Sequence, residues 1–189
     1  MLWDPRTLPL RGEWRASGPL LPIEFSRVAL DGRVTLVIDP RAEGIQTYVT
    51  LLSVSTLEEA VEQLGVREKI APPRRSEWVG LQTRDRPDRN RGDTGSGVRE
   101  SIADWLGGQP LDAVVWTALP ARGPSGDFER PELDVLLTHL ESLTGSARAR
   151  AEEYIRRAPQ TVRTPYRRRF EEVFGWEAEI RDPLARADG

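Results

Sequence analysis

The spacing of the apolar residues changes along this chain, and that change is the strongest constraint on its fold. In residues 20–54 they form strand-like runs. The run at 33–38 is apolar almost throughout, which predicts a strand covered on both faces. From residue 132 onward the apolar residues recur at helical spacing instead. Strands early and helices late are typical of the α+β class rather than of regular β-α-β winding.

A length of 189 residues suits one domain, which we expect over residues 1–176 with a tail at 177–189. Residues 84–97 are rich in Arg, Asp and Gly and predict a flexible loop. The expected strands are 23–28, 33–38, 45–54, 77–83 and 113–119, the first three joined as a meander. The expected helices are 56–68, 98–106 and 132–143, then one capped by Ser146 and one that opens at Thr164-Pro165 and stops at Gly175.

Two residue counts exclude several kinds of chemistry. The chain has no cysteine, which rules out disulfides, thiol nucleophiles and cysteine metal sites. It has one histidine, His139, so a histidine-rich zinc site cannot be built and a Ser-His-Asp triad would have to use that residue. We expect His139 to be a half-exposed surface residue. Neither a metal nor an organic cofactor is predicted.

Charge and hydropathy favour a cytoplasmic protein without a membrane partner. No run approaches the roughly 20 apolar residues of a membrane span, and the N-terminus lacks a secretory signal. The net charge of −3 makes a nucleic-acid partner unlikely. The C-terminal arginines, in 148–157 and 167–169, alternate with glutamates and predict solvated helical faces. A local patch for nucleic acid or an anionic ligand is the alternative for them.

One short motif looks like chemistry but lacks the setting that the chemistry needs. Asp93-Thr94-Gly95-Ser96 has the wording of an aspartic-protease signature, yet it occurs once and nothing around it would bury the carboxyl group. The segment 92–97 also resembles a phosphate-binding loop. It lacks the Lys-Ser/Thr ending and follows no expected strand, so a flexible loop is favoured.

Glu68 is the more informative carboxylate. It follows Leu57, Val61 and Leu64 at helical spacing, so a helix that persisted would aim it inward, where burial would suit it to proton transfer. The alternative is that Gly65 ends the helix, and that Glu68 then lies on the surface or pairs with a nearby arginine. Glu59 lies on roughly the opposite face of the same helix, three residues after Thr56, which predicts a capping box.

Five short segments, in order, resemble the ChaC-type γ-glutamylcyclotransferases. Residues 2–5 resemble the end of the Tyr-Gly-Ser-Leu-x-Trp-x-Pro segment that opens those enzymes, and 35–40 resemble one of their central strands. Residues 64–69 resemble their Leu-Asp-x-Arg-Glu-Lys segment, with Gly65 in place of the aspartate. Glu59 matches a second glutamate of that subfamily, and 123–126 match a Gly-Pro-Ser-Gly. The order agrees over about two thirds of the chain, and no counterpart is found for the helices after Ser146.

The resemblance implies a small mixed barrel-like sheet with flanking helices, to which this chain adds C-terminal helices. It also implies a cofactor-free reaction, in which the α-amine of a γ-glutamyl group attacks its own γ-carbonyl and releases 5-oxoproline and an amine. Glu68 would be the acid/base, with Met1, Leu2, Trp3 and Glu59 at the substrate. The sequence begins at Met1, so the Tyr-Gly-Ser part is not among these residues. Either the chain starts upstream or is truncated, or this protein lacks the loop.

Two hypotheses of different kinds therefore stand. The first is an enzyme that cyclises a small γ-glutamyl substrate. The second is a non-catalytic member of the same fold that binds a metabolite or a partner protein. A third, nucleic-acid binding through the C-terminal arginines, is disfavoured by the net charge of −3.

Overall fold

The computed structural model describes residues 7–92 and 94–179, and the chain divides into two compact units. Unit 1 comprises Met1–Leu21 and Gln46–Leu119, and unit 2 comprises Pro22–Ile45 and Pro120–Gly189. Each unit is therefore built from two stretches of chain that are distant in sequence. The expectation of one domain over residues 1–176 stays a prediction.

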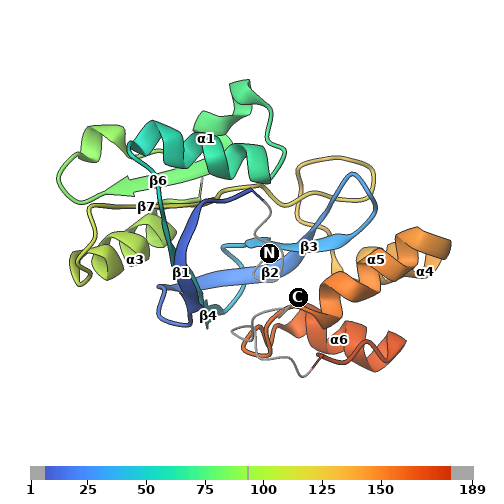
Figure 1. Ribbon diagram of the computed structural model, residues 1–189. Helices are drawn as coiled ribbons and strands as arrows, with labels where there is room; N and C mark the ends of the chain where they lie inside the picture. The colour runs from blue at the N-terminus through green and yellow to red at the C-terminus, as the bar shows by residue number, and fades with distance from the viewer. Residues whose placement is uncertain (1–6, 93, 180–189) are drawn as a thin grey trace. The chain divides into compact units, whose positions relative to one another are not determined.

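Unit 1 contains two antiparallel pairs of strands (Figure 1). Strand β1 (Leu10–Arg15) pairs with β5 (Val49–Leu52), and β6 (Val79–Thr83) pairs with β7 (Ala113–Thr117). Helix α1 (Leu57–Arg67) packs on one face of the β6–β7 ribbon, through a core of Val61, Ile70, Val79 and Leu81. Helix α3 (Ser96–Gly107) lies on the other side (Figure 1). The short helices η1 (Pro72–Arg74), α2 (Arg75–Trp78) and η2 (Pro87–Arg89) complete the unit.

Unit 2 packs helices against a small sheet. Its strands, in the order β3-β2-β4, are β3 (Val34–Ile38), β2 (Leu20–Val28) and β4 (Gly44–Gln46), with β2 and β3 antiparallel. Its helices are α4 (Leu133–Ser142), α5 (Gly145–Arg156) and α6 (Pro165–Phe174). The core centres on Phe25, which meets Phe170 edge to face at 5.9 Å and is joined by buried Leu136, Leu140 and Ile155. Burial of these side chains is the main force that holds the unit together.

The predicted α+β class is confirmed, but the sheet differs from the expected one. The strands form three small sheets, and they do not close into a barrel within the described residues. The expected strand 45–54 is two strands, because Thr47 turns the chain between them. Its carbonyl accepts from Gly18 N–H at 3.1 Å, and its hydroxyl donates to Pro19 O at 2.6 Å. Strand β5 can then pair with β1, which the sequence did not predict, so the three-strand meander is wrong.

The predicted helices are present, with small shifts at their ends. Thr164 caps α6, Pro165 opens it, and Gly175 ends it at φ 68°, as expected. Helix α5 follows Thr144 rather than Ser146. Segment 84–97 is hydrogen-bonded to β6, since Arg91 and Leu81 exchange backbone hydrogen bonds of 2.9 and 3.0 Å. Its predicted flexibility stays a prediction, and α3 begins at Ser96 rather than at 98.

Candidate functional site

The end of α1 is fixed by a Schellman motif. Ile70 N–H donates to Gly65 O at 2.8 Å, and Lys69 N–H donates to Val66 O at 3.0 Å. Lys69 holds the left-handed conformation that closes this motif, with φ 57°. It is the one residue other than glycine with a positive φ in the described part of the chain. Helix α1 therefore stops at Arg67, and Glu68 is its C-cap.

Glu68 leaves the apolar stripe for this reason, and its side chain is half-buried at 21% exposure. Its carboxylate pairs with the guanidinium of Arg67, which is only 8% exposed. Of the two arrangements weighed from the sequence, the structure matches the one in which Glu68 pairs with a nearby arginine. The buried guanidinium holds a partly exposed carboxylate in place at a rigid corner of the backbone.

Glu59 lies in the first turn of α1, while Glu68 ends the helix. Glu59 N–H donates to the Thr56 hydroxyl at 3.1 Å, and the Glu59 carboxylate accepts from Ser55 N–H at 2.8 Å. The capping box is present, although its return bond reaches Ser55 rather than Thr56. The other residues expected at the substrate, Met1, Leu2 and Trp3, lie outside the described residues, as does Asp93 of the protease-like motif.

Lys69→Gly is expected to raise the free energy of unfolding by about 0.5–1 kcal/mol. A left-handed conformation costs a residue with Cβ about 1–2 kcal/mol, and the greater freedom of glycine in the unfolded chain offsets part of that gain. Urea denaturation measures the change. The control Val66→Gly, in the last turn of the same helix, should lower stability instead. A loss of stability in Lys69→Gly would contradict the strain.

Unit 2 buries two carboxylates that the sequence did not single out. The first is Glu24 on β2, at 1% exposure. It accepts hydrogen bonds from the Thr164 hydroxyl, from Phe25 N–H at 2.8 Å and from Tyr166 N–H at 3.3 Å, and thus sits at the start of α6. Burial raises the pKa of Glu24 above its usual value of 4.5, and the lowering effect of these hydrogen bonds and of Arg130 does not offset it.

The second buried carboxylate, Asp39, is 3% exposed and pairs with Arg130. The Arg130 guanidinium also covers the ring of Tyr166, at 4.7 Å from the ring centre. Burial raises the pKa of Tyr166 above 10.0 as well. This group holds two carboxylates and one guanidinium, so a proton on Glu24 would leave it neutral. Every carboxylate in it is occupied by protein donors, which indicates a structural role.

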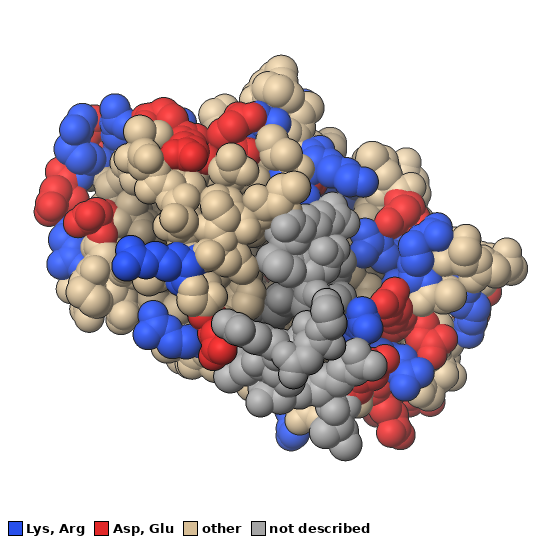
Figure 2. All heavy atoms as spheres, viewed as in Figure 1, with Lys and Arg blue, Asp and Glu red and all other residues tan. Residues whose placement is uncertain are grey.

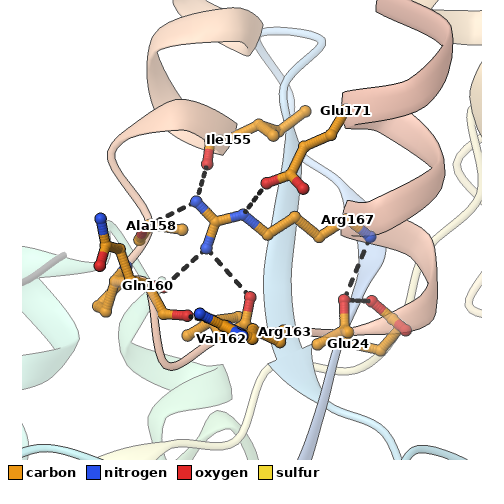
Figure 3. A network of polar contacts seen from close by, with 10 residues as sticks. Glu24, Ile155, Ala158, Gln160, Val162, Arg163, Arg167 and Glu171 are labelled. Atoms are coloured by element: carbon orange, nitrogen blue, oxygen red, sulfur yellow. Dashed lines mark hydrogen bonds and ion pairs between the residues drawn. The ribbon is translucent and has the colours of Figure 1, made fainter. Parts of the chain in front are cut away.

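Arg167 forms the densest polar network of unit 2 (Figure 3). Its guanidinium donates to four backbone carbonyls at the end of α5 and in the turn that follows it, and its Nε pairs with Glu171 at 3.1 Å. The four donor–acceptor distances are 2.7 Å to Pro159, 3.0 Å to Val162, 3.1 Å to Ile155 and 2.9 Å to Ala158. The side chain is 2% exposed, so the cluster 167–169 is not uniformly solvated as the sequence predicted.

The other C-terminal arginines behave as the sequence predicted. Arg156 and Arg157 make i, i+4 ion pairs with Glu152 and Glu153, and Arg169 pairs with Glu172. Figure 2 shows basic and acidic side chains interspersed on the visible face rather than gathered by sign. His139 is half-buried, and its Nε2 lies 2.7 Å from Gly32 O. Alternating charge of this kind does not form a surface for nucleic acid.

Two kinds of site are not found in the described part of the chain. Residues 7–92 and 94–179 contain no group of three or more histidine, cysteine, aspartate or glutamate side chains arranged to hold a metal ion. No helix among them has the length and apolar character required to cross a membrane.

Comparison with protein-family models, with curated proteins and with solved structures found no match to this chain. The geometry of the described residues therefore carries the functional argument by itself.

Proposed function

We propose that this protein has a γ-glutamylcyclotransferase-like fold and cyclises a γ-glutamyl group to 5-oxoproline, with Glu68 as the acid/base. The observation that carries the proposal is the pairing of the partly exposed Glu68 carboxylate with buried Arg67 at the rigid end of α1. An acid/base must be held in position and still reach its substrate, and this arrangement meets both conditions.

The chemistry asks for one proton carrier. The carboxylate takes a proton from the attacking α-amine and returns it to the nitrogen of the departing amine, so no cofactor takes part. The ionised form of Glu68, favoured by the guanidinium beside it, is the form that accepts the proton. The α+β class and the ordered motifs around residues 35–40, 64–69 and 123–126 support the proposal.

Glu68→Gln is expected to lower the release of 5-oxoproline about 10²- to 10⁴-fold, which is the usual contribution of a positioned acid/base. The full chain is incubated with glutathione and a panel of γ-glutamyl amines and dipeptides, and 5-oxoproline is quantified by chromatography. Glutamine keeps the shape of the side chain and a hydrogen bond to Arg67, so the thermal melting temperature should change little.

Glu62→Gln is the matched control, because Glu62 lies on the same helix and also pairs with an arginine, Arg75, but is 56% exposed. It should retain full turnover. Equal turnover by wild type and Glu68→Gln would sink the assignment of Glu68, and no turnover of any γ-glutamyl compound by wild type would sink the proposed reaction.

A non-catalytic protein of the same fold, binding a metabolite or a partner protein, is the second candidate. The observation that favours it is that Glu68 already has a partner in Arg67, which gives the carboxylate a structural role. This function predicts no turnover but a raised melting temperature with a γ-glutamyl or other anionic ligand. A ligand screen without any shift, and no co-purifying partner, would remove its support.

A further inference from the structure

The loop that leads into α3 holds unpaired hydrogen-bond donors that the proposed reaction at Glu68 does not use. The backbone N–H groups of Ser96 and Gly97 open the helix, and no side chain caps them because the N-cap residue is Gly95. Thr94 stands one residue before this cap and is 6% exposed. Its Oγ1 has no hydrogen-bond partner among the described residues. A buried hydroxyl without a partner is rare and calls for an explanation.

Two more buried donors without a partner in the described part of the chain are Arg91 Nε and Trp116 Nε1. Both residues lie close to this loop. Arg91 is hydrogen-bonded to Leu81 on β6, and the next residue, Gly92, packs so tightly that a Cβ there would lie 2.5 Å from the Cα of Gly80. The indole of Trp116 covers Gly80 as well.

These residues share the α3 side of the β6–β7 ribbon. Val79 and Leu81 face the core beneath α1, so Gly80, which alternates with them, faces the other way, toward the side where α3 lies (Figure 1). A Cβ on Gly80 would lie 2.0 Å from the indole of Trp116, which places that indole on the same face. The unpaired donors and the start of α3 therefore belong to one region of unit 1.

Every one of these groups can donate a hydrogen bond, so the missing partner is an acceptor. Guanidinium and indole N–H groups have no acceptor function, and the N-terminus of a helix attracts negative charge. Arg99 adds a second guanidinium, which donates to Gly92 O and holds the loop against α3. Arg89, farther along the loop, pairs with Glu58 and is not available in the same way.

We propose that the loop before α3 binds a phosphate-type oxyanion, through the N–H groups of Ser96 and Gly97, the Thr94 hydroxyl and the Arg91 guanidinium. A tetrahedral oxyanion offers enough acceptor oxygens to satisfy these donors at once, as in other anion sites at helix N-termini. The Thr94 hydroxyl is sealed from solvent, so binding includes a small movement of the loop. This site is independent of Glu68 and of the proposed reaction.

The test is a titration of the isotope-labelled full chain with inorganic phosphate at constant ionic strength, followed by amide NMR. We expect saturable shifts of the Ser96 and Gly97 amides. Helix α5 provides an internal control, because its N-cap, Thr144, likewise makes no side-chain capping bond. The amide of Ser146 in its first turn should not shift. A parallel titration with acetate distinguishes a phosphate-type ligand from a carboxylate.

Two variants remove one donor each. Thr94→Val replaces the hydroxyl with a methyl group of similar shape, and Arg91→Gln removes the charge; each should weaken phosphate binding about tenfold or more. Arg89→Gln is the matched control in the same loop and should bind as wild type does. The melting temperature of Thr94→Val should not fall, since the variant removes an unpaired buried hydroxyl.

Three results would overturn the site. Equal shifts at the starts of α3 and α5 would show a general helix effect, and unchanged binding in both Thr94→Val and Arg91→Gln would show that these donors take no part. Acetate binding as tight as phosphate would overturn the phosphate assignment.

Discussion

Replacing Arg167 with methionine is expected to lower the free energy of unfolding by about 3 kcal/mol or more. The change leaves four buried carbonyls at the end of α5 without a donor, and each unsatisfied buried group costs about 1–3 kcal/mol. Burial lowers the pKa of Arg167, which means that the folded state also carries the cost of burying its charge. Removing that cost recovers part of the loss, so the lower end of the summed penalty is expected.

Urea denaturation of the full chain measures this effect. Arg169→Met is the control, because Arg169 lies on the same helix, is 50% exposed and makes one surface ion pair. It should cost less than about 1 kcal/mol. Arg167→Lys should fall between the two, since one ammonium group cannot reach as many carbonyls as the planar guanidinium. If Arg167→Met proved as stable as Arg169→Met, the arginine would be filling space rather than joining the helices.

The pH dependence of stability is expected to carry the signature of Glu24, the second large effect. Its folded-state pKa is raised above 4.5 by burial, so the folded state holds the proton more tightly than the unfolded state does. The stability that Glu24 contributes is thus fully present below pH 4.5 and is lost as the pH rises through the raised pKa. One proton gives a slope of at most about 1.4 kcal/mol per pH unit in that window.

Glu24→Gln removes this titration while keeping an amide oxygen as acceptor. The difference in unfolding free energy between the variant and wild type should therefore shift in favour of the variant as the pH rises from 4 toward neutrality. Urea denaturation at a series of pH values measures it. Glu141→Gln, an exposed glutamate on α4, is the control and should run parallel to wild type. A parallel curve for Glu24→Gln would mean that burial does not control Glu24.

Glu24 and Arg167 also mark the limit of the sequence. The run Ile23-Glu24-Phe25 looks the same whether the glutamate faces solvent or the start of a helix. Its partner, Thr164, is 140 residues away, so no local pattern reports the contact. Arg167 stands in a run of three arginines that alternation with glutamate predicts to be solvated. Because Tyr166 and Phe170 are buried on α6, the residue beside them turns inward too, while Arg169 stays outside.

The candidate site at Glu68 lies between these cases. The sequence supplied both outcomes for the end of α1, a helix that persists or one that Gly65 terminates, but could not choose. The choice was made by Ile70, whose burial against the β6–β7 ribbon draws the chain into the Schellman turn. Met1, Leu2 and Trp3 lie outside the described residues, and the acid/base role of Glu68 stays a prediction.

The sequence by itself determined the α+β class, most of the helices and strands, and the caps at Thr56, Thr164 and Gly175. These follow from apolar spacing and from bonds between residues a few positions apart. Only the tertiary structure decided how the strands divide into three sheets, which charged residues are buried, and which donors before α3 remain unpaired. Those features depend on which distant segments meet, and the free energy of such contacts leaves no periodic trace in the chain.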